Sequence, residues 1–155
     1  MEIILIRHGK AEEKREDLED IKRHLTQKGE EEFKKLTPEL KEKLDLLDNR
    51  TIIIWSSPAM RALETAQFVA DELQTDISSI YDFIYEGDFE KMSSEVQKLD
   101  DNTTILIVGH QPSLSEWTKH MAGEDVKIRK GDMLNFKVTN QSPLEAELQW
   151  KITAG

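Results

Sequence analysis

The chain opens with Met1-Glu2-Ile3-Ile4-Leu5-Ile6-Arg7-His8-Gly9, in which four consecutive apolar residues lead directly into Arg, His and Gly. A short apolar run that is mostly β-branched predicts a strand buried on both faces. A Gly at its end lets the backbone turn sharply and approach a ligand. Arg supplies a planar set of donors that suits phosphate, and neutral His is a nucleophile near pH 7. Because ligands bind beyond the carboxyl ends of strands in open α/β sheets, we expect a phosphate site here.

Two further apolar runs, residues 51–55 and 103–108, predict two more buried strands. The first is followed by Ser57, a candidate N-cap, and by Pro58, which we expect to open a helix that carries a basic side chain in its first turn. The amino end of that helix adds unpaired amides and the positive end of its dipole. Since the carboxyl ends of parallel strands share one edge of a sheet, four side chains are expected to converge there: Arg7, His8, Arg61 and His110.

The segments between and after these strands complete the expected architecture. Apolar residues at helical spacing from 33 to 47 are interrupted by Thr37-Pro38, which predicts either a kink or two abutting helices, with Thr37 as an N-cap. The rest of the pattern predicts a short strand at 80–85, a helix capped by Asp88, a short helix opened by Pro112, and strands at 132–138 and 145–152. Alternating strands and helices indicate a three-layer α/β/α fold with a mainly parallel central sheet, and we expect residues 1–155 to form this single domain.

The composition limits the class of protein. Of the 155 residues, 37% are hydrophobic and 34% are charged, which is typical of a soluble globular domain. There is no Cys, so disulfides, a thiol nucleophile and thiolate metal sites are excluded. We recognise neither a secretory signal nor an apolar run of the roughly 20 residues that span a bilayer, and we expect a cytoplasmic protein.

The charge balance restricts the partners. The 31 acidic and 21 basic residues give a formal net charge of −10, and the basic residues form no stripe. Such a chain repels polyanions, so we expect no nucleic-acid partner and no membrane partner. A phosphate site must then be a local cationic pocket. The overall charge also disfavours highly anionic small substrates, which favours a macromolecular or modestly charged phosphorylated substrate.

Four blocks of the sequence resemble, in order and spacing, the histidine phosphatase superfamily with its phosphoglycerate-mutase-like fold. They are Arg7-His8-Gly9, DIKRHLTQKG at 20–29, SSPAMRALETA at 56–66, and Val108-Gly109-His110. The short chain is similar in particular to the SixA-type phosphohistidine phosphatases, which lack the large helical insertion that covers the site in larger relatives. The blocks extend over nearly the whole chain.

The resemblance implies a metal-independent phosphatase that works through a phosphohistidine on the enzyme. His8 would attack phosphorus and become phosphorylated. Arg7, Arg61 and His110 would hold the phosphoryl oxygens and balance charge in the transition state. Water would then hydrolyse the phosphoenzyme. Neither a metal nor a cofactor is implied, because the cationic pocket supplies the positive charge.

Three further residues are candidates for the edge of the site. Arg23 matches an Arg of the SixA-type branch and would contact phosphate or substrate, unless it only pairs with nearby acids. Lys10 adds positive charge where relatives often have a small or acidic residue. Glu86, which precedes Gly87, is either the general acid that larger relatives use or an ordinary turn residue. The SixA-type branch has no fixed carboxylate there, and solvent can protonate the imidazole that leaves a phosphohistidine.

These observations leave more than one function open. The first hypothesis is a phosphatase for phosphohistidine in a protein. The second is a phosphatase for a small phosphorylated metabolite. The third is a non-catalytic phosphate-binding regulatory module, and the presence of both His8 and His110 argues against it. The charged run at 12–23 is expected to be a solvated loop with at most a turn of helix, beside the mouth of the site.

Overall fold

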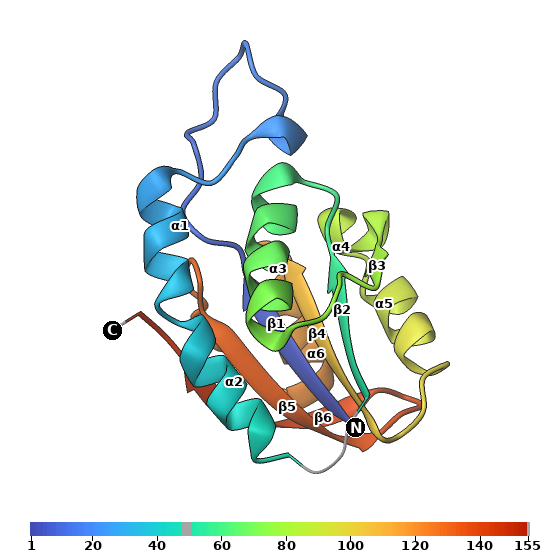
Figure 1. The fold of residues 1–155 in the computed structure, drawn as a ribbon. Helices are drawn as coiled ribbons and strands as arrows, with labels where there is room; N and C mark the ends of the chain where they lie inside the picture. The colour runs from blue at the N-terminus through green and yellow to red at the C-terminus, as the bar shows by residue number, and fades with distance from the viewer. Residues whose placement is uncertain (48–50, 155) are drawn as a thin grey trace.

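The computed structural model describes residues 1–47 and 51–154. Its strands are β1 (Glu2–Arg7), β2 (Thr51–Ser56), β3 (Ser79–Ile80), β4 (Thr103–Gly109), β5 (Met133–Asn140) and β6 (Glu145–Ile152). They form one six-stranded sheet in the order β3-β2-β4-β1-β5-β6 (Figure 1). Strands β1 to β4 are parallel, whereas β5 is antiparallel to β1 and β6 is antiparallel to β5. The prediction of a mainly parallel sheet is confirmed.

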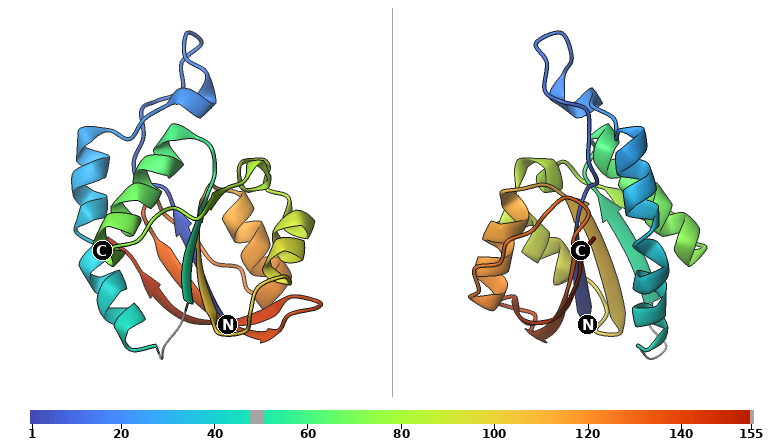
Figure 2. Two further views of the ribbon diagram at one scale, coloured as in Figure 1. Left: turned by 45° about the vertical axis from the view of Figure 1, so that its right-hand side comes forward. Right: turned by 90° about the vertical axis from the view of Figure 1, so that its left-hand side faces the viewer.

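Helices cover both faces of this sheet. They are α1 (Gln27–Lys34), α2 (Thr37–Asp45), α3 (Met60–Leu73), α4 (Asp82–Glu86), α5 (Phe89–Val96) and α6 (Ser113–Ala122). The first three lie on one face and the last three on the other (Figure 2), so the three-layer α/β/α prediction is confirmed. The described chain has no large helical insertion. None of its helices is long and apolar enough to cross a membrane.

Strand β1 shows why both faces must be covered. Successive side chains of a strand point to opposite faces of the sheet. Ile3 and Leu5 pack into the core beneath α4, α5 and α6, whereas Ile4 and Ile6 pack into the core beneath α1, α2 and α3. All four side chains are fully buried. A central strand in this position therefore needs an uninterrupted apolar run.

Two helix starts differ from the sequence expectation. The prediction that Thr37 caps α2 is wrong, because Leu36 is the N-cap and Thr37 is already helical. The helix expected to open at Pro58 begins at Met60 instead. The reason is that the Ser57 N–H still donates to the Val108 carbonyl (3.1 Å), which keeps the backbone extended beyond the end of β2.

The strand expected at 80–85 is also shorter than predicted. Strand β3 contains only Ser79 and Ile80, and helix α4 begins at Asp82. Phe83 and Ile84 are consecutive and both are buried. Neighbouring side chains of a strand point to opposite faces of the sheet, whereas Phe83 and Ile84 pack into the same core, as neighbours on one side of a helical turn can.

The register of the sheet places the carboxyl ends of β1 and β4 side by side. Arg7 is paired with Gly109, and the His8 N–H donates to the Gly109 carbonyl (3.2 Å). The loop between β1 and α1 rises above this edge, at the top of Figure 1, and returns through a bridge between Ala11 and Leu25. It contains the predicted single turn of helix, η1 (Asp20–Lys22). The two histidines and this loop therefore meet at one end of the sheet.

Candidate active site

His8 has one ring nitrogen that is held and one that is available. Its side chain lies just beyond β1 and is only 7% exposed. Nδ1 is 2.6 Å from the Gly9 carbonyl oxygen. Because a carbonyl can only accept, we assign the proton to Nδ1, which leaves the lone pair on Nε2. Burial lowers the pKa of His8 to about 3, and the positive charges of Arg61 and Arg7 act in the same direction. His8 is therefore a neutral imidazole near pH 7, as a nucleophile must be.

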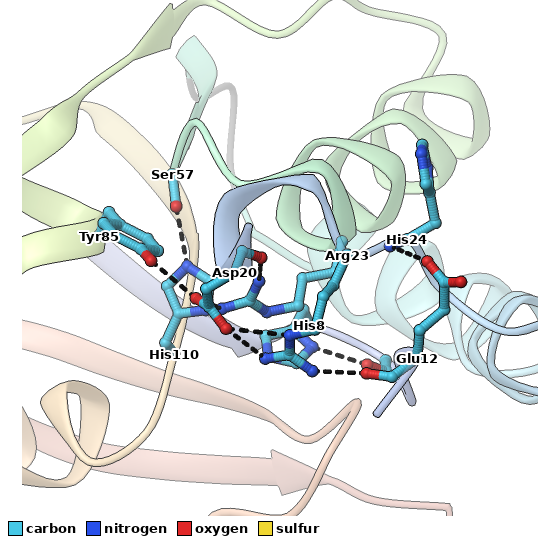
Figure 3. A network of polar contacts seen from close by, with 10 residues as sticks. His8, Glu12, Asp20, Arg23, His24, Ser57, Tyr85 and His110 are labelled. Carbon is cyan, nitrogen blue, oxygen red and sulfur yellow. Dashed lines mark hydrogen bonds and ion pairs between the residues drawn. The ribbon is translucent and has the colours of Figure 1, made fainter. Parts of the chain in front are cut away.

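His110 lies beside His8, and its Nε2 atom contacts Ser57. The two ring centroids are 5.1 Å apart. His110 Nε2 is 2.8 Å from Ser57 Oγ (Figure 3). Ser57 Oγ also accepts from the Ala59 N–H (3.2 Å). A hydroxyl can both donate and accept, and we assign the Ser57 hydroxyl as the donor to Nε2, which places the imidazole proton on Nδ1. Burial, followed by the charge of Arg61, lowers the pKa of His110 to about 4.

These two buried imidazoles predict that the protein loses stability on mild acidification. In the folded protein the pKa values of His8 and His110 are about 3 and about 4, whereas an unfolded His takes up a proton near pH 6.5. The unfolded chain binds more protons below pH 6.5, so lowering the pH favours unfolding. From pH 6.5 to pH 5 we expect the free energy of unfolding to fall by about 3 kcal/mol, shared equally between the two residues.

Urea unfolding at several pH values measures this loss. The His8→Ala variant should lose about half as much stability as the wild type over the same interval, since one of the two residues is removed. An unchanged pH dependence in that variant would show that His8 is not held neutral in the folded protein.

Three buried nitrogens at this site have no hydrogen-bond partner among the described residues. They are Arg7 Nε, Arg61 Nε and His110 Nδ1. Both guanidinium groups are held at their ends: Arg7 Nη1 donates to the Ile128 carbonyl (2.9 Å) and Arg61 Nη1 donates to the Asp20 carbonyl (2.7 Å). Buried N–H groups are rarely left without an acceptor. The three residues line one cavity, and their remaining donors are suited to bind the oxygens of a phosphoryl group.

The space is a cavity of about 510 Å³ at the carboxyl edge of β1 and β4. Five of the predicted site residues line it: Arg7, His8, Arg23, Arg61 and His110. Its remaining lining residues are Ala11, Lys14, Asp20, Tyr85, Gln111 and Lys130. A larger hollow of about 710 Å³ lies between α5, α6 and the β5–β6 hairpin, but it contains none of the predicted site residues.

The structure does not bring Lys10 and Glu86 into this cavity. Lys10 is exposed and faces a separate small hollow beside α1, whereas the next residue, Ala11, lines the cavity. The segment is extended here, so neighbouring side chains point to opposite sides. Glu86 is exposed at the end of α4, and it is Tyr85 that lines the cavity. Neither residue therefore has a contact in the structure that supports its expected role.

Sequence reasoning missed Asp20, which is at the centre of the polar network in Figure 3. Its carboxylate accepts hydrogen bonds from Arg23, Arg61 and Tyr85. Burial raises its pKa, but these three donors outweigh burial and hold the pKa well below its usual range. Its position three residues before Arg23, on opposite ends of a single helical turn, is the sequence signal that could have indicated it. Nothing in the sequence pattern indicated Tyr85.

A layered α/β fold with a cationic cavity around an available imidazole nitrogen defines a class of enzymes that act on phosphoryl groups. Comparison with known proteins agrees. The family model of the histidine phosphatase superfamily (branch 1) matches residues 3–103. The chain therefore belongs to the histidine phosphatase superfamily, and it is a phosphatase of that superfamily.

Relatives and solved structures extend the likeness to the whole chain. An uncharacterized protein from a Picosynechococcus strain is 27% identical over 144 residues, which cover 88% of this chain and 85% of that protein. The structure of the protein histidine phosphatase SixA complexed with tungstate superposes with a TM-score of 0.85 at 21% identity, covering 99% of this chain and 97% of SixA. A mycobacterial glucosyl-3-phosphoglycerate phosphatase superposes with a TM-score of 0.73 at 9% identity, covering 96% of each chain. At these identities the structures establish a shared fold.

Proposed function

We propose that this phosphatase removes the phosphoryl group from phosphohistidine in a protein, through a phosphohistidine intermediate on His8 and without a metal ion. The observation that carries the proposal is the convergence of Arg7, Arg61 and His110 with His8 in one cavity, where each of the three has a buried nitrogen without a hydrogen-bond partner among the described residues. A phosphoryl group bound in this cavity would lie beside His8 and would supply acceptors for the donors of these residues.

The first half of the reaction transfers the phosphoryl group to the enzyme. His8 Nε2 attacks phosphorus in line, and the bond from phosphorus to the leaving imidazole breaks as a proton from solvent reaches that imidazole. The His8 ring gains positive charge as the new bond forms. The Gly9 carbonyl oxygen, 2.6 Å from Nδ1, stabilises that charge. The guanidinium groups of Arg7 and Arg61 supply the positive charge that the phosphoryl oxygens require.

The second half of the reaction restores the enzyme. A water molecule attacks phosphorus, the bond between phosphorus and His8 Nε2 breaks, and inorganic phosphate leaves. His8 returns to its neutral form with the proton still on Nδ1. Because burial and nearby cations keep the His8 pKa low, the ring regains a free lone pair without an external base.

Three features favour a protein substrate. The net charge of −10 repels small, highly anionic metabolites. The described chain has no large helical insertion over the cavity, so a side chain on another protein can reach it. A phosphohistidine also needs no strong general acid, and no acidic side chain other than Asp20 lines the cavity among the described residues. The SixA structure, whose name denotes a protein histidine phosphatase, shares this fold at full length. A cytoplasmic location accords with this role and stays a prediction.

A small phosphorylated metabolite is the second candidate substrate. The exposed side chains of Lys14 and Lys130 lie at the mouth of the cavity, where they would suit a second anionic group on a small molecule. The fold is also shared with a glucosyl-3-phosphoglycerate phosphatase.

The test compares two substrates in the presence of EDTA. We expect the wild-type enzyme to release phosphate from a phosphohistidine protein at least ~10-fold faster, in kcat/KM, than from p-nitrophenyl phosphate, since the uncovered cavity admits a side chain of another protein and the net charge of −10 disfavours a small anion. EDTA should not change either rate. Preference for the small ester would support the metabolite reading. Loss of activity in EDTA, restored by a divalent cation, would contradict the metal-independent mechanism.

A further inference from the structure

Asp20 places a carboxylate inside a cavity that is otherwise strongly cationic. Five basic side chains line the cavity: Arg7, Lys14, Arg23, Arg61 and Lys130. Among the described lining residues Asp20 is the one acid, and its side chain is 35% exposed. A carboxylate in an anion-binding site repels an anionic substrate, so its presence there calls for a structural or catalytic explanation.

Both oxygens of this carboxylate are engaged by neighbouring side chains. Oδ1 accepts a hydrogen bond from Arg23 Nε (2.9 Å) and forms an ion pair with Arg23 Nη2 (2.9 Å). Oδ2 accepts from Arg61 Nη2 (2.9 Å) and Tyr85 Oη (2.7 Å). Asp20 is therefore placed to hold the two arginines.

The backbone around Asp20 is attached firmly to the start of α3. The Asp20 carbonyl accepts from Arg61 Nη1 (2.7 Å), and the Arg61 N–H donates to the Arg23 carbonyl (3.1 Å). A little further along, the Leu25 N–H donates to the Glu64 carboxylate (2.8 Å). These contacts tie the loop to the helix on both sides of Arg23. Asp20 is thus held in the cavity wall by contacts of both its backbone and its side chain.

Holding Arg61 from one side leaves its other side directed at the cavity. Asp20 occupies one hydrogen of Nη1 and one hydrogen of Nη2, whereas the Arg61 Nε is buried without a partner. The guanidinium plane is fixed by two contacts to a single residue. The donors that remain are those available to a phosphoryl group, and their direction depends on Asp20.

From this geometry we propose that Asp20 is a positioning residue for phosphoryl transfer, which orients Arg61 and Arg23 and offsets part of their charge. The inference rests on the phosphatase function proposed above. Catalysis requires interactions that are stronger in the transition state than with bound substrate or product. Oriented donors favour the transition state specifically, whereas surplus positive charge would bind any phosphate, including the product. Asp20 orients the arginine donors and reduces the surplus positive charge.

The Asp20→Asn variant separates the two effects. The amide retains the shape of the side chain but loses the charge and the acceptor at the oxygen that becomes its nitrogen. We expect kcat to fall by ~10- to 100-fold, the usual cost of misplaced catalytic donors. We expect inorganic phosphate to bind about fivefold more tightly, as removal of one nearby negative charge implies. The measurements are steady-state kinetics and calorimetric titration with inorganic phosphate. Asp17→Asn is the matched control, because Asp17 is in the same loop and pairs only with Arg15 at the surface.

Other outcomes overturn the inference. An unchanged kcat would show that Asp20 does not position the catalytic arginines, and a parallel loss of kcat and phosphate affinity would indicate general structural damage. A rise in both kcat and phosphate affinity would show that Asp20 blocks the site and is displaced by the substrate. Should Asp20→Asn fold poorly, Tyr85→Phe removes one donor to Oδ2 and should lower kcat about threefold, and no change there would also refute the role. A wild-type enzyme inactive on both substrates refutes the proposed function, whereas an active wild type with an unaffected variant refutes this inference alone.

Discussion

Replacing His8 with Ala is expected to reduce phosphatase activity by at least ~10⁴-fold, the largest effect of any single substitution in this chain. The Nε2 atom of His8 forms the covalent bond to phosphorus in the proposed reaction, and no other described nitrogen in the cavity can replace it. His110 Nε2 is engaged with Ser57, and the arginines remain protonated. The variant should still bind phosphate, because the arginines and His110 remain.

The measurement has two parts. Steady-state rates on a phosphohistidine protein and on p-nitrophenyl phosphate give the loss of turnover. Mass spectrometry of enzyme quenched during turnover should show one phosphoryl group on the wild type and none on the variant. His120→Ala is the matched control, because His120 is on α6, away from the cavity, where it stacks on Phe89. A His8→Ala enzyme that keeps a tenth of its activity would exclude the covalent mechanism on this residue.

The Arg61→Ala substitution is expected to lower kcat by about 10³-fold, the effect of removing a principal donor to the transition state. The loss exceeds that of one hydrogen bond for two reasons. Arg61 lines the cavity, and it also holds Asp20 through Nη1 and Nη2, so its removal takes two contacts from the residue whose carboxylate pairs with Arg23. The Arg61 side chain is only 5% exposed, so its charge is poorly screened by solvent and its interaction with a bound phosphoryl group is correspondingly strong.

Arg61→Lys tests which property matters. Lysine restores the charge but not the planar set of donors, so we expect it to recover about 10-fold of the loss and no more. Arg15→Ala, in the exposed part of the loop between β1 and α1, serves as the control for a lost arginine. Full activity in Arg61→Lys would mean that charge alone suffices and that the orientation of the guanidinium group is irrelevant.

The sheet and the convergence of the main site residues could be predicted because they depend on local patterns. A run such as Ile3 to Ile6 has few alternatives to a central strand, and a Gly or polar residue marks where it ends. Parallel strands then bring their ends together regardless of the sequence between them. Arg7, His8 and His110 follow from this rule directly, and Arg61 follows from the helix after β2.

The rest depends on where single side chains point, which no periodic pattern records. Lys10 and Ala11 differ by one position and face opposite ways because the backbone is extended there. Tyr85, and not Glu86, reaches the cavity because residues 82–86 form a helix and not the expected strand. Asp20 was missed because an acid in a stretch of many acids has no distinguishing mark until the loop is folded against α3.

The backbone pairing of β1 with β4 positions the two imidazoles of the site, whereas the exposed residues at the mouth of the cavity lie outside this pairing. The rings of His8 and His110 are 5.1 Å apart, close to the roughly 4.8 Å between neighbouring strands of any sheet. The backbone pairing in the buried sheet therefore contributes to this spacing. The exposed side chains of Lys14 and Lys130 line the mouth of the cavity and take no part in that pairing or in the hydrogen bonds of Asp20. Substrate choice can thus be re-engineered at these two positions, with Asp20, Arg23 and Tyr85 left in place, while the chemistry stays constant.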